Sequence, residues 1–121
     1  MKELMAYAYK LGVKRLAIEP MSCLAEPPSL PDEIHAMAET LRGFHRDNPQ
    51  TAEAGYCVDV AHGYADHEGR VRYTNMELFE AALPYLTEIH LKNTDALFDS
   101  TFGFTQVERA RGIVQIELIR A

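Results

Sequence analysis

The sequence predicts an α/β fold in which about three parallel strands alternate with helices. Two patterns predict this class: short apolar runs recur along the chain, and each follows a segment with apolar residues at helical spacing. Helices and strands in this order are typical of parallel sheets with helical crossovers. A third pattern concerns chemistry. Each apolar run ends in a residue that can bind a divalent metal ion, and parallel strands present their carboxyl ends on one side of a sheet.

Length and composition indicate one soluble domain over residues 1–121. The chain is 47% hydrophobic and 25% charged, and no apolar run approaches the about 18 residues that a membrane span needs. Its net charge of -6 argues against a nucleic-acid partner, which would attract clustered Lys and Arg. Two cysteines, Cys23 and Cys57, and no signal-peptide pattern favour the cytoplasm. We interpret Cys57 as a small buried apolar residue.

The first unit is a helix followed by a strand. Residues 2–11 carry apolar side chains at helical spacing, and Gly12 supplies a helix stop. The strand is expected from Val13 to Glu19, because Pro20 cannot donate to a sheet ladder. A proline-rich loop then leads to Asp32, which we predict as the cap of a second helix. The apolar stripe of that helix consists of Ile34, Met37, Ala38, Leu41 and Phe44.

The second unit repeats this pattern. A strand is expected from Tyr56 to Val60, followed by a polar loop over residues 63–73. Thr74 and Glu77 have the spacing of a capping box, which predicts a helix from residue 75. Pro84 should end that helix, since it cannot continue the helical ladder. The side chains expected to point inward are Met76, Phe79, Leu83 and Leu86.

The third strand is expected over residues 89–92, and the three strand ends carry the candidate metal ligands. These are Glu19, Asp59 and His90, and His62 lies three residues beyond Asp59. Residues far apart in the sequence can meet there, because they sit at equivalent ends of parallel strands. Oxygen and imidazole ligands suit an ion such as magnesium or manganese.

The end of the chain can be read in two ways. Thr105 and Glu108 form a second capping box, which predicts a short helix that stops before Gly112. Residues 112–119 then fit either a strand, which would offer Glu117 as a fourth ligand, or an apolar-faced helix. We favour the helix, because the short helix before it is not long enough for a crossover.

Each candidate ligand has a simpler explanation. Glu19 could pair with Arg15 or Lys14, and His90 could be a hydrogen-bonded core histidine. An unpaired Asp59 inside an apolar run would be costly to bury, so it needs an ion or another strong partner. These alternatives stay open at the level of sequence.

Four segments, taken together, resemble the sugar isomerase and epimerase superfamily with the xylose-isomerase-like (β/α)8 TIM barrel. They are Ala17 to Pro20, Cys57 to His62, Ile89 to Asp95 and Gly112 to Val114. The resemblance implies that residues 1–121 form one partial barrel domain, with strands corresponding to the fifth to seventh. It also implies a site of Glu, Asp, His and Glu ligands, of which Glu19, Asp59 and His90 are the first three. The strand bearing the last glutamate would lie outside this sequence, so we expect a barrel fragment lacking the fourth ligand.

The function implied by the resemblance is that of a metal-dependent isomerase or epimerase of a sugar or sugar phosphate. In such a parent enzyme Mn²⁺, Mg²⁺ or Co²⁺, ahead of Zn²⁺, would stabilise an enediolate during proton transfer, with Glu19 as the catalytic base. His62 would contact the sugar. Glu26 and Lys92 are weaker candidates for substrate binding, and a surface pair with Asp95 is the alternative for Lys92. A full-length parent could also form a homo-oligomer.

Two other classes were weighed. The apurinic endonuclease family shares this barrel and acts on DNA with three zinc ions, but it adds an Asp-x-His pair after the corresponding strand. Residues 93–111 contain no histidine, and the acidic balance does not suit DNA. The remaining alternative is an inactive, metal-free barrel fragment, which a metal titration would separate from the enzyme.

Overall fold

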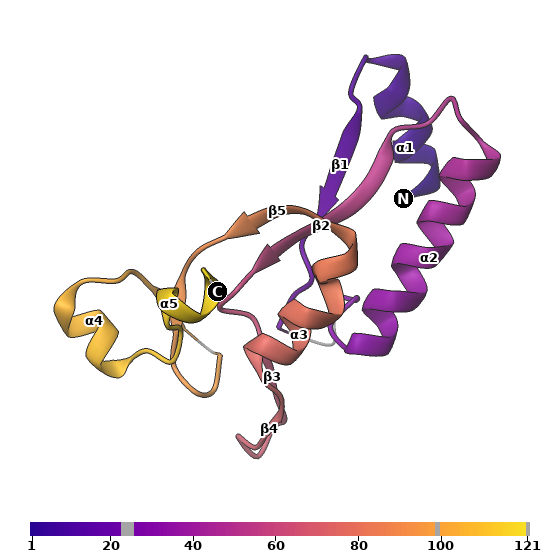
Figure 1. Ribbon diagram of the computed structural model, residues 1–121. Coiled ribbons are helices and arrows are strands. Elements are labelled where there is room, and N and C mark those ends of the chain that lie inside the picture. The colour runs from indigo at the N-terminus through magenta and orange to yellow at the C-terminus, as the bar shows by residue number, and fades with distance from the viewer. Residues whose placement is uncertain (23–25, 99, 121) are drawn as a thin grey trace.

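A three-stranded parallel sheet lies at the centre of the molecule. The computed structural model describes residues 1–22, 26–98 and 100–120. β1 (Arg15–Ile18) and β5 (Leu86–His90) pair on either side of β2 (Glu53–Asp59), both in parallel (Figure 1). The predicted α/β class with three parallel strands is confirmed. Within these described ranges the sheet does not close into a barrel.

The first unit follows the sequence prediction closely. α1 (Lys2–Lys10) ends before Gly12, which turns the chain at a φ of 81°. That backbone conformation is one that glycine adopts without steric cost. β1 is shorter than the expected run from Val13 to Glu19, because its pairing with β2 begins only at Arg15.

The start of α2 (Pro31–Asp47) corrects the predicted cap. Asp32 lies in the first turn, not at the cap, because the helix begins at Pro31. Proline is favoured at the first helical position, where no backbone N–H is needed and its φ is already helical. The Glu33 carboxylate accepts hydrogen bonds from the backbone N–H groups of Ser29 and Leu30, at 2.9 and 3.2 Å.

The apolar stripe of α2 is confirmed, and it faces β2. Tyr56 and Val58 of β2 pack in one buried cluster with residues of α2 and α3 (Asn75–Ala82), and both helices lie on the same side of the sheet (Figure 1). The Tyr56 hydroxyl donates a 2.7 Å hydrogen bond to the backbone carbonyl of Ile34. Because side chains alternate along a strand, Cys57 and Asp59 lie on the opposite face. The other members of the buried cluster are Ile34, Ala38, Leu78, Ala81 and Ala82.

α3 confirms its predicted cap and part of its predicted inward face, since Phe79 and the following Leu86 are partly buried against the core cluster. The Thr74 hydroxyl accepts the Glu77 N–H, and the Glu77 carboxylate accepts the Thr74 N–H. Pro84 lies in a 3-10 turn, η1 (Leu83–Tyr85), so the helix ends at Ala82 as expected. Leu83 is nevertheless exposed, because the helix turns the side with Leu78 and Ala82 toward the core. The buried residues of α3 are Asn75, Leu78, Ala81 and Ala82.

The predicted polar loop over residues 63–73 contains a small antiparallel hairpin. It is formed by β3 (Tyr64–Ala65) and β4 (Val71–Tyr73). The Asp66 carboxylate accepts hydrogen bonds from the backbone N–H groups of Glu68 and Arg70, each at 3.0 Å. These bonds fix the turn, so the segment predicted as a polar loop contains two short paired strands.

The third strand begins and ends earlier than predicted. β5 covers residues 86–90 where the sequence indicated 89–92, because the chain becomes extended directly after η1. A second short antiparallel pair follows, made of β6 (Asn93–Thr94) and β7 (Thr101–Phe102).

The last part of the chain follows the helical reading in part, and it contains no strand over residues 112–119. The predicted capping box opens α4 (Gln106–Arg111), which stops before Gly112. The next residues are irregular, and only α5 (Ile116–Ile119) is helical. Glu117 forms an ion pair with Arg109 at 3.0 Å, so it does not join the candidate ligands.

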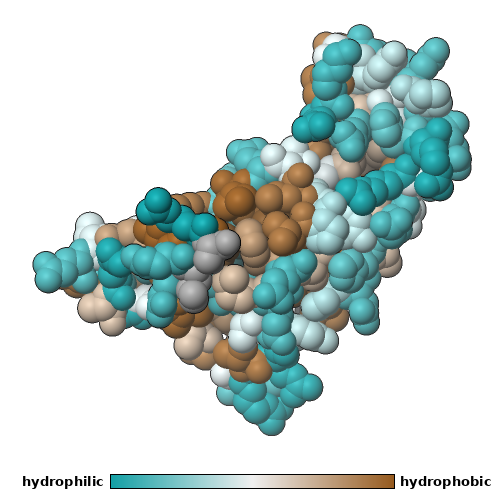
Figure 2. Space-filling model, in the orientation of Figure 1, coloured by the Kyte–Doolittle hydropathy of each residue, from teal (hydrophilic) through white to brown (hydrophobic). Residues whose placement is uncertain are grey.

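Apolar surface is gathered near the middle of the molecule, where β5 and α3 lie (Figure 2). Exposed apolar side chains on these elements and their neighbours include Leu83 and Ile89. No helix in the described part of the chain has the length and apolar character needed to traverse a bilayer.

Candidate metal centre

Strand register places the candidate ligands at one end of the sheet. β2 and β5 pair Asp59 with His90, and Glu19 directly follows the last paired residue of β1. Each side chain therefore stands at the carboxyl end of its strand. The structure brings all three together, with a ligand atom of each within 4.8 Å of the others.

The cluster combines a buried anchor with two more accessible groups. The Asp59 side chain is fully buried, whereas those of Glu19 and His90 are 32% and 39% exposed. Glu19 Oε1 lies 3.5 Å from His90 Nδ1. Adjacent ligands of an octahedral ion at about 2.1 Å would be separated by roughly 3 Å. For this pair, only a small contraction would give ligand spacing.

His62 lies inside this cluster. Its Nε2 atom is 3.3 Å from Asp59 Oδ2 and 3.5 Å from Glu19 Oε1, and its side chain is 13% exposed. A turn after β2 positions it: the His62 N–H donates to the Asp59 carbonyl, and Asp59 Oδ1 accepts the Ala61 N–H, each at 3.0 Å. The sequence indicated a substrate contact, and the geometry adds a second option, that of a nitrogen ligand.

Lys92 also contacts the buried carboxylate. Its ammonium nitrogen lies 2.8 Å from Asp59 Oδ2, while the side chain is 45% exposed. The hydrogen bond with Asp59 raises the pKa of Lys92, so this lysine is charged at neutral pH. Asp95, the alternative partner considered from the sequence, accepts hydrogen bonds from the Leu97 N–H and the Ser100 hydroxyl.

The surroundings of Asp59 keep its carboxyl group ionised. Burial alone would raise its pKa, but hydrogen bonds from His62, Lys92 and the Ala61 N–H outweigh burial and lower the pKa to about 2. An ionised carboxylate in a fully buried position needs positive charge close by. In the chain itself Lys92 supplies that charge.

Two imidazole nitrogens indicate room for a further partner. His62 Nδ1 and His90 Nδ1 are buried atoms without a hydrogen bond to any described residue. Such unsatisfied groups are rare in folded proteins and call for an explanation, of which an ion or a water molecule is the usual one. Of the two, only His90 Nδ1 faces Glu19, because His62 faces the carboxylates through its Nε2 atom. The unsatisfied nitrogen of His90 and the Nε2 atom of His62 therefore give this point a donor set that fits a divalent cation.

The remaining candidates lie elsewhere. Glu26 is exposed in the segment before α2, and its side chain has no hydrogen bond or ion pair with the cluster among the described residues. Arg15, considered as a partner of Glu19, pairs with Glu53 at 3.2 Å. Cys23 lies outside the described residues.

Two further residues share the face of this cluster. Cys57 and Glu88 each lie two positions before a candidate ligand and pair with one another in the sheet. Sequence reasoning missed Glu88 and treated Cys57 only as a packing residue, although alternation along a strand could have identified both. Burial raises the pKa of the Cys57 thiol, and the nearby carboxylates, Glu88 first, raise it further.

Two carboxylates and two imidazoles around one point can hold a divalent ion and expose it on the side of Glu19 and His90. Comparison of the chain with models of protein families, with curated proteins and with solved structures found no match. The geometry of these residues is therefore the basis on which a function can be assigned to the chain.

Proposed function

We propose that this chain carries the metal-binding part of a divalent-metal-dependent isomerase or epimerase acting on a sugar or sugar phosphate, and that its sheet is part of a (β/α)8 barrel. One observation carries the proposal. Glu19, Asp59 and His90 converge at the carboxyl ends of three adjacent parallel strands. That end of the strands is where barrel enzymes place their chemistry.

The donor set supports a hard or borderline ion. Asp59 offers a carboxylate that stays ionised because its pKa is about 2, and the imidazoles of His62 and His90 add nitrogen donors. Mn²⁺, Mg²⁺ and Co²⁺ accept such mixed oxygen and nitrogen ligands. When bound, the cation would supply charge stabilisation for the substrate oxygens beside the reacting carbon.

The residues around the metal would have different roles in proton transfer and substrate binding. Glu19 is the carboxylate nearest to solvent in the cluster, so it can reach the proton on a carbon next to a carbonyl and act as the base. Asp59 is buried and holds position, with its Oδ1 fixed by the Ala61 N–H. His62 stands beside both carboxylates and can orient a substrate hydroxyl.

Metal affinity is the first test. Titration with Mn²⁺, followed by electron paramagnetic resonance, should show one bound ion, and Asp59→Asn should remove that binding. Asp47→Asn is the matched control, because Asp47 is an exposed residue at the end of α2 and its substitution changes the charge equally. Equal affinity in the two variants would contradict the proposed site.

Catalysis is the second test. With Mn²⁺ in D₂O, a panel of aldoses, ketoses and their phosphates should gain deuterium at the carbon beside the carbonyl, and nuclear magnetic resonance detects this exchange. Glu19→Gln should abolish the exchange, because its amide cannot take up the proton. A chain that binds Mn²⁺ but exchanges no proton in any of these sugars would show that Glu19 is not a sufficient base in this part of the barrel, while leaving the metal site.

A further inference from the structure

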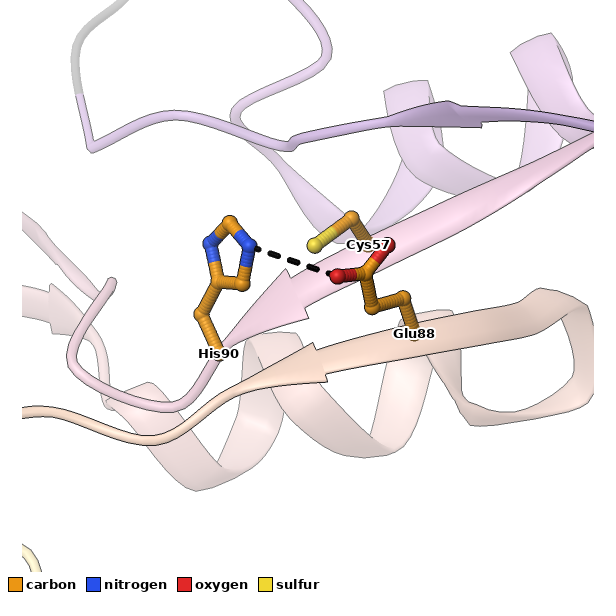
Figure 3. Close-up of side chains that lie close together, drawn as sticks. All are labelled: Cys57, Glu88 and His90. Carbon is orange, nitrogen blue, oxygen red and sulfur yellow. Dashed lines mark ion pairs between the residues drawn. The ribbon is translucent and has the colours of Figure 1, made fainter.

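Cys57 and Glu88 complete a second group of potential ligands with His90. The Cys57 sulfur, a Glu88 carboxylate oxygen and a His90 nitrogen all lie within 4.8 Å of one another. Figure 3 shows the three side chains over the same face of β2 and β5, with the sulfur turned toward the imidazole ring. Register explains the grouping, since Cys57 pairs with Glu88 two rungs before the pair of Asp59 and His90, and side chains two positions apart on a strand share a face.

The imidazole of His90 separates the two groups. Its Nδ1 atom lies 3.5 Å from Glu19 Oε1, and its Nε2 atom lies 3.8 Å from Glu88 Oε1. One nitrogen thus faces the oxygen-rich cluster and the other faces the thiol side. A neutral imidazole offers only one unprotonated nitrogen, so it can ligate an ion on one side at a time.

We propose that Cys57, Glu88 and His90 form a second cation site, which takes a thiol-binding divalent ion such as Zn²⁺. This inference does not depend on the isomerase assignment. Thiolate ligands select zinc and similar ions, whereas the oxygen-rich cluster favours manganese or magnesium. The two sites share one histidine, so occupation of the thiolate site should weaken binding of Mn²⁺ at the other.

The geometry suits a four-coordinate ion. Ligands of tetrahedral zinc lie roughly 3.3 to 3.7 Å apart, close to the 3.8 Å between Glu88 and His90. The Glu88 side chain is 61% exposed, so it can move toward the thiol. Cys57 is buried and supplies the fixed ligand, and the exposure of the other two leaves space for water as the fourth.

Cobalt provides a direct test, because thiolate ligation of Co²⁺ gives a charge-transfer absorption that oxygen and nitrogen ligands do not give. The full chain is used with Cys23→Ser, so that any thiolate signal must come from Cys57. Addition of Co²⁺ should produce this band with saturation at one ion. The band should disappear with Cys57→Ser and persist with Asp59→Asn.

Glu88→Gln tests the site with a variant that should fold normally, because the Glu88 side chain is largely exposed. It should weaken Co²⁺ affinity at the thiolate site by about tenfold or more, while the circular dichroism spectrum stays unchanged. Absence of the band at saturating Co²⁺ would overturn the second site. Loss of the band in Asp59→Asn would do so as well, since it would show a single shared centre.

Discussion

Replacement of Lys92 by methionine should tighten binding of a divalent ion at the oxygen-rich cluster. The Lys92 ammonium lies 2.8 Å from Asp59 Oδ2. A cation bound to the same oxygen at about 2.1 Å would lie roughly 4 Å from the ammonium. At that distance, charges of +2 and +1 repel by about 2 kcal/mol even at the dielectric constant of water. The full repulsion would correspond to roughly 30-fold in affinity.

The expected gain is about tenfold, because the Lys92 side chain is 45% exposed and can swing away when the ion binds. Isothermal titration calorimetry with Mn²⁺ measures the affinity of the wild-type chain and of Lys92→Met. Lys14→Met is the control for net charge, since Lys14 is exposed and precedes β1. Unchanged or weaker binding in Lys92→Met, with the control unchanged, would refute the idea that the ammonium and the ion compete for Asp59.

Two further predictions concern the fold. Gly55→Ala should lower the free energy of unfolding by about 1–3 kcal/mol, measured in urea, because a Cβ there would collide with the Thr87 hydroxyl and lie 2.7 Å from the Tyr85 carbonyl. An unchanged urea midpoint would contradict this close approach of β2 and β5. The hairpin of β3 and β4 should loosen in acid, because hydrogen bonds from Arg70 hold the pKa of Asp66 below its usual value. The ionised Asp66 carboxylate stabilises the hairpin fully above its unfolded pKa of about 3.9, and this stabilisation is lost as the pH falls through the lower pKa of the folded state. The Arg70 amide resonance should therefore titrate below pH about 3.9.

The parts of the fold that follow local rules could be predicted from the sequence. Gly12 ended its helix because glycine adopts a positive φ without steric cost, and Pro84 ended its helix because proline cannot continue the helical hydrogen bonds. The capping boxes at Thr74 and Thr105 both formed, since each needs only two residues at fixed spacing. The approach of Asp59 and His90 followed from the parallel arrangement of their strands.

Features that depend on tertiary packing could not be predicted in this way. The fully buried face of α3 carries Leu78 and Ala82 where the sequence predicted Leu83, because packing against the core decides which side of the helix turns inward, and a helical pattern alone does not show that choice. The strands of the hairpin contain only two and three residues, which is too short for an alternating pattern to show in the sequence, and the hairpin depends on the turn at Asp66. Likewise, the contact of Lys92 with Asp59 joins the segment after β5 to the end of β2, where the sequence suggested a substrate contact or a pair with Asp95.

The alternation along β2 also protects the correct alignment of this strand. Tyr56 and Val58 belong to the apolar interior, whereas Cys57 and Asp59 face the ionisable cluster. A slip of β2 by one position would exchange these two sets of side chains. It would force the Asp59 carboxylate among apolar side chains of the helices and turn an aromatic ring toward the charged face. A misaligned β2 would therefore lose stability on both faces of the sheet, so the side chains of this one strand favour the native pairing during folding.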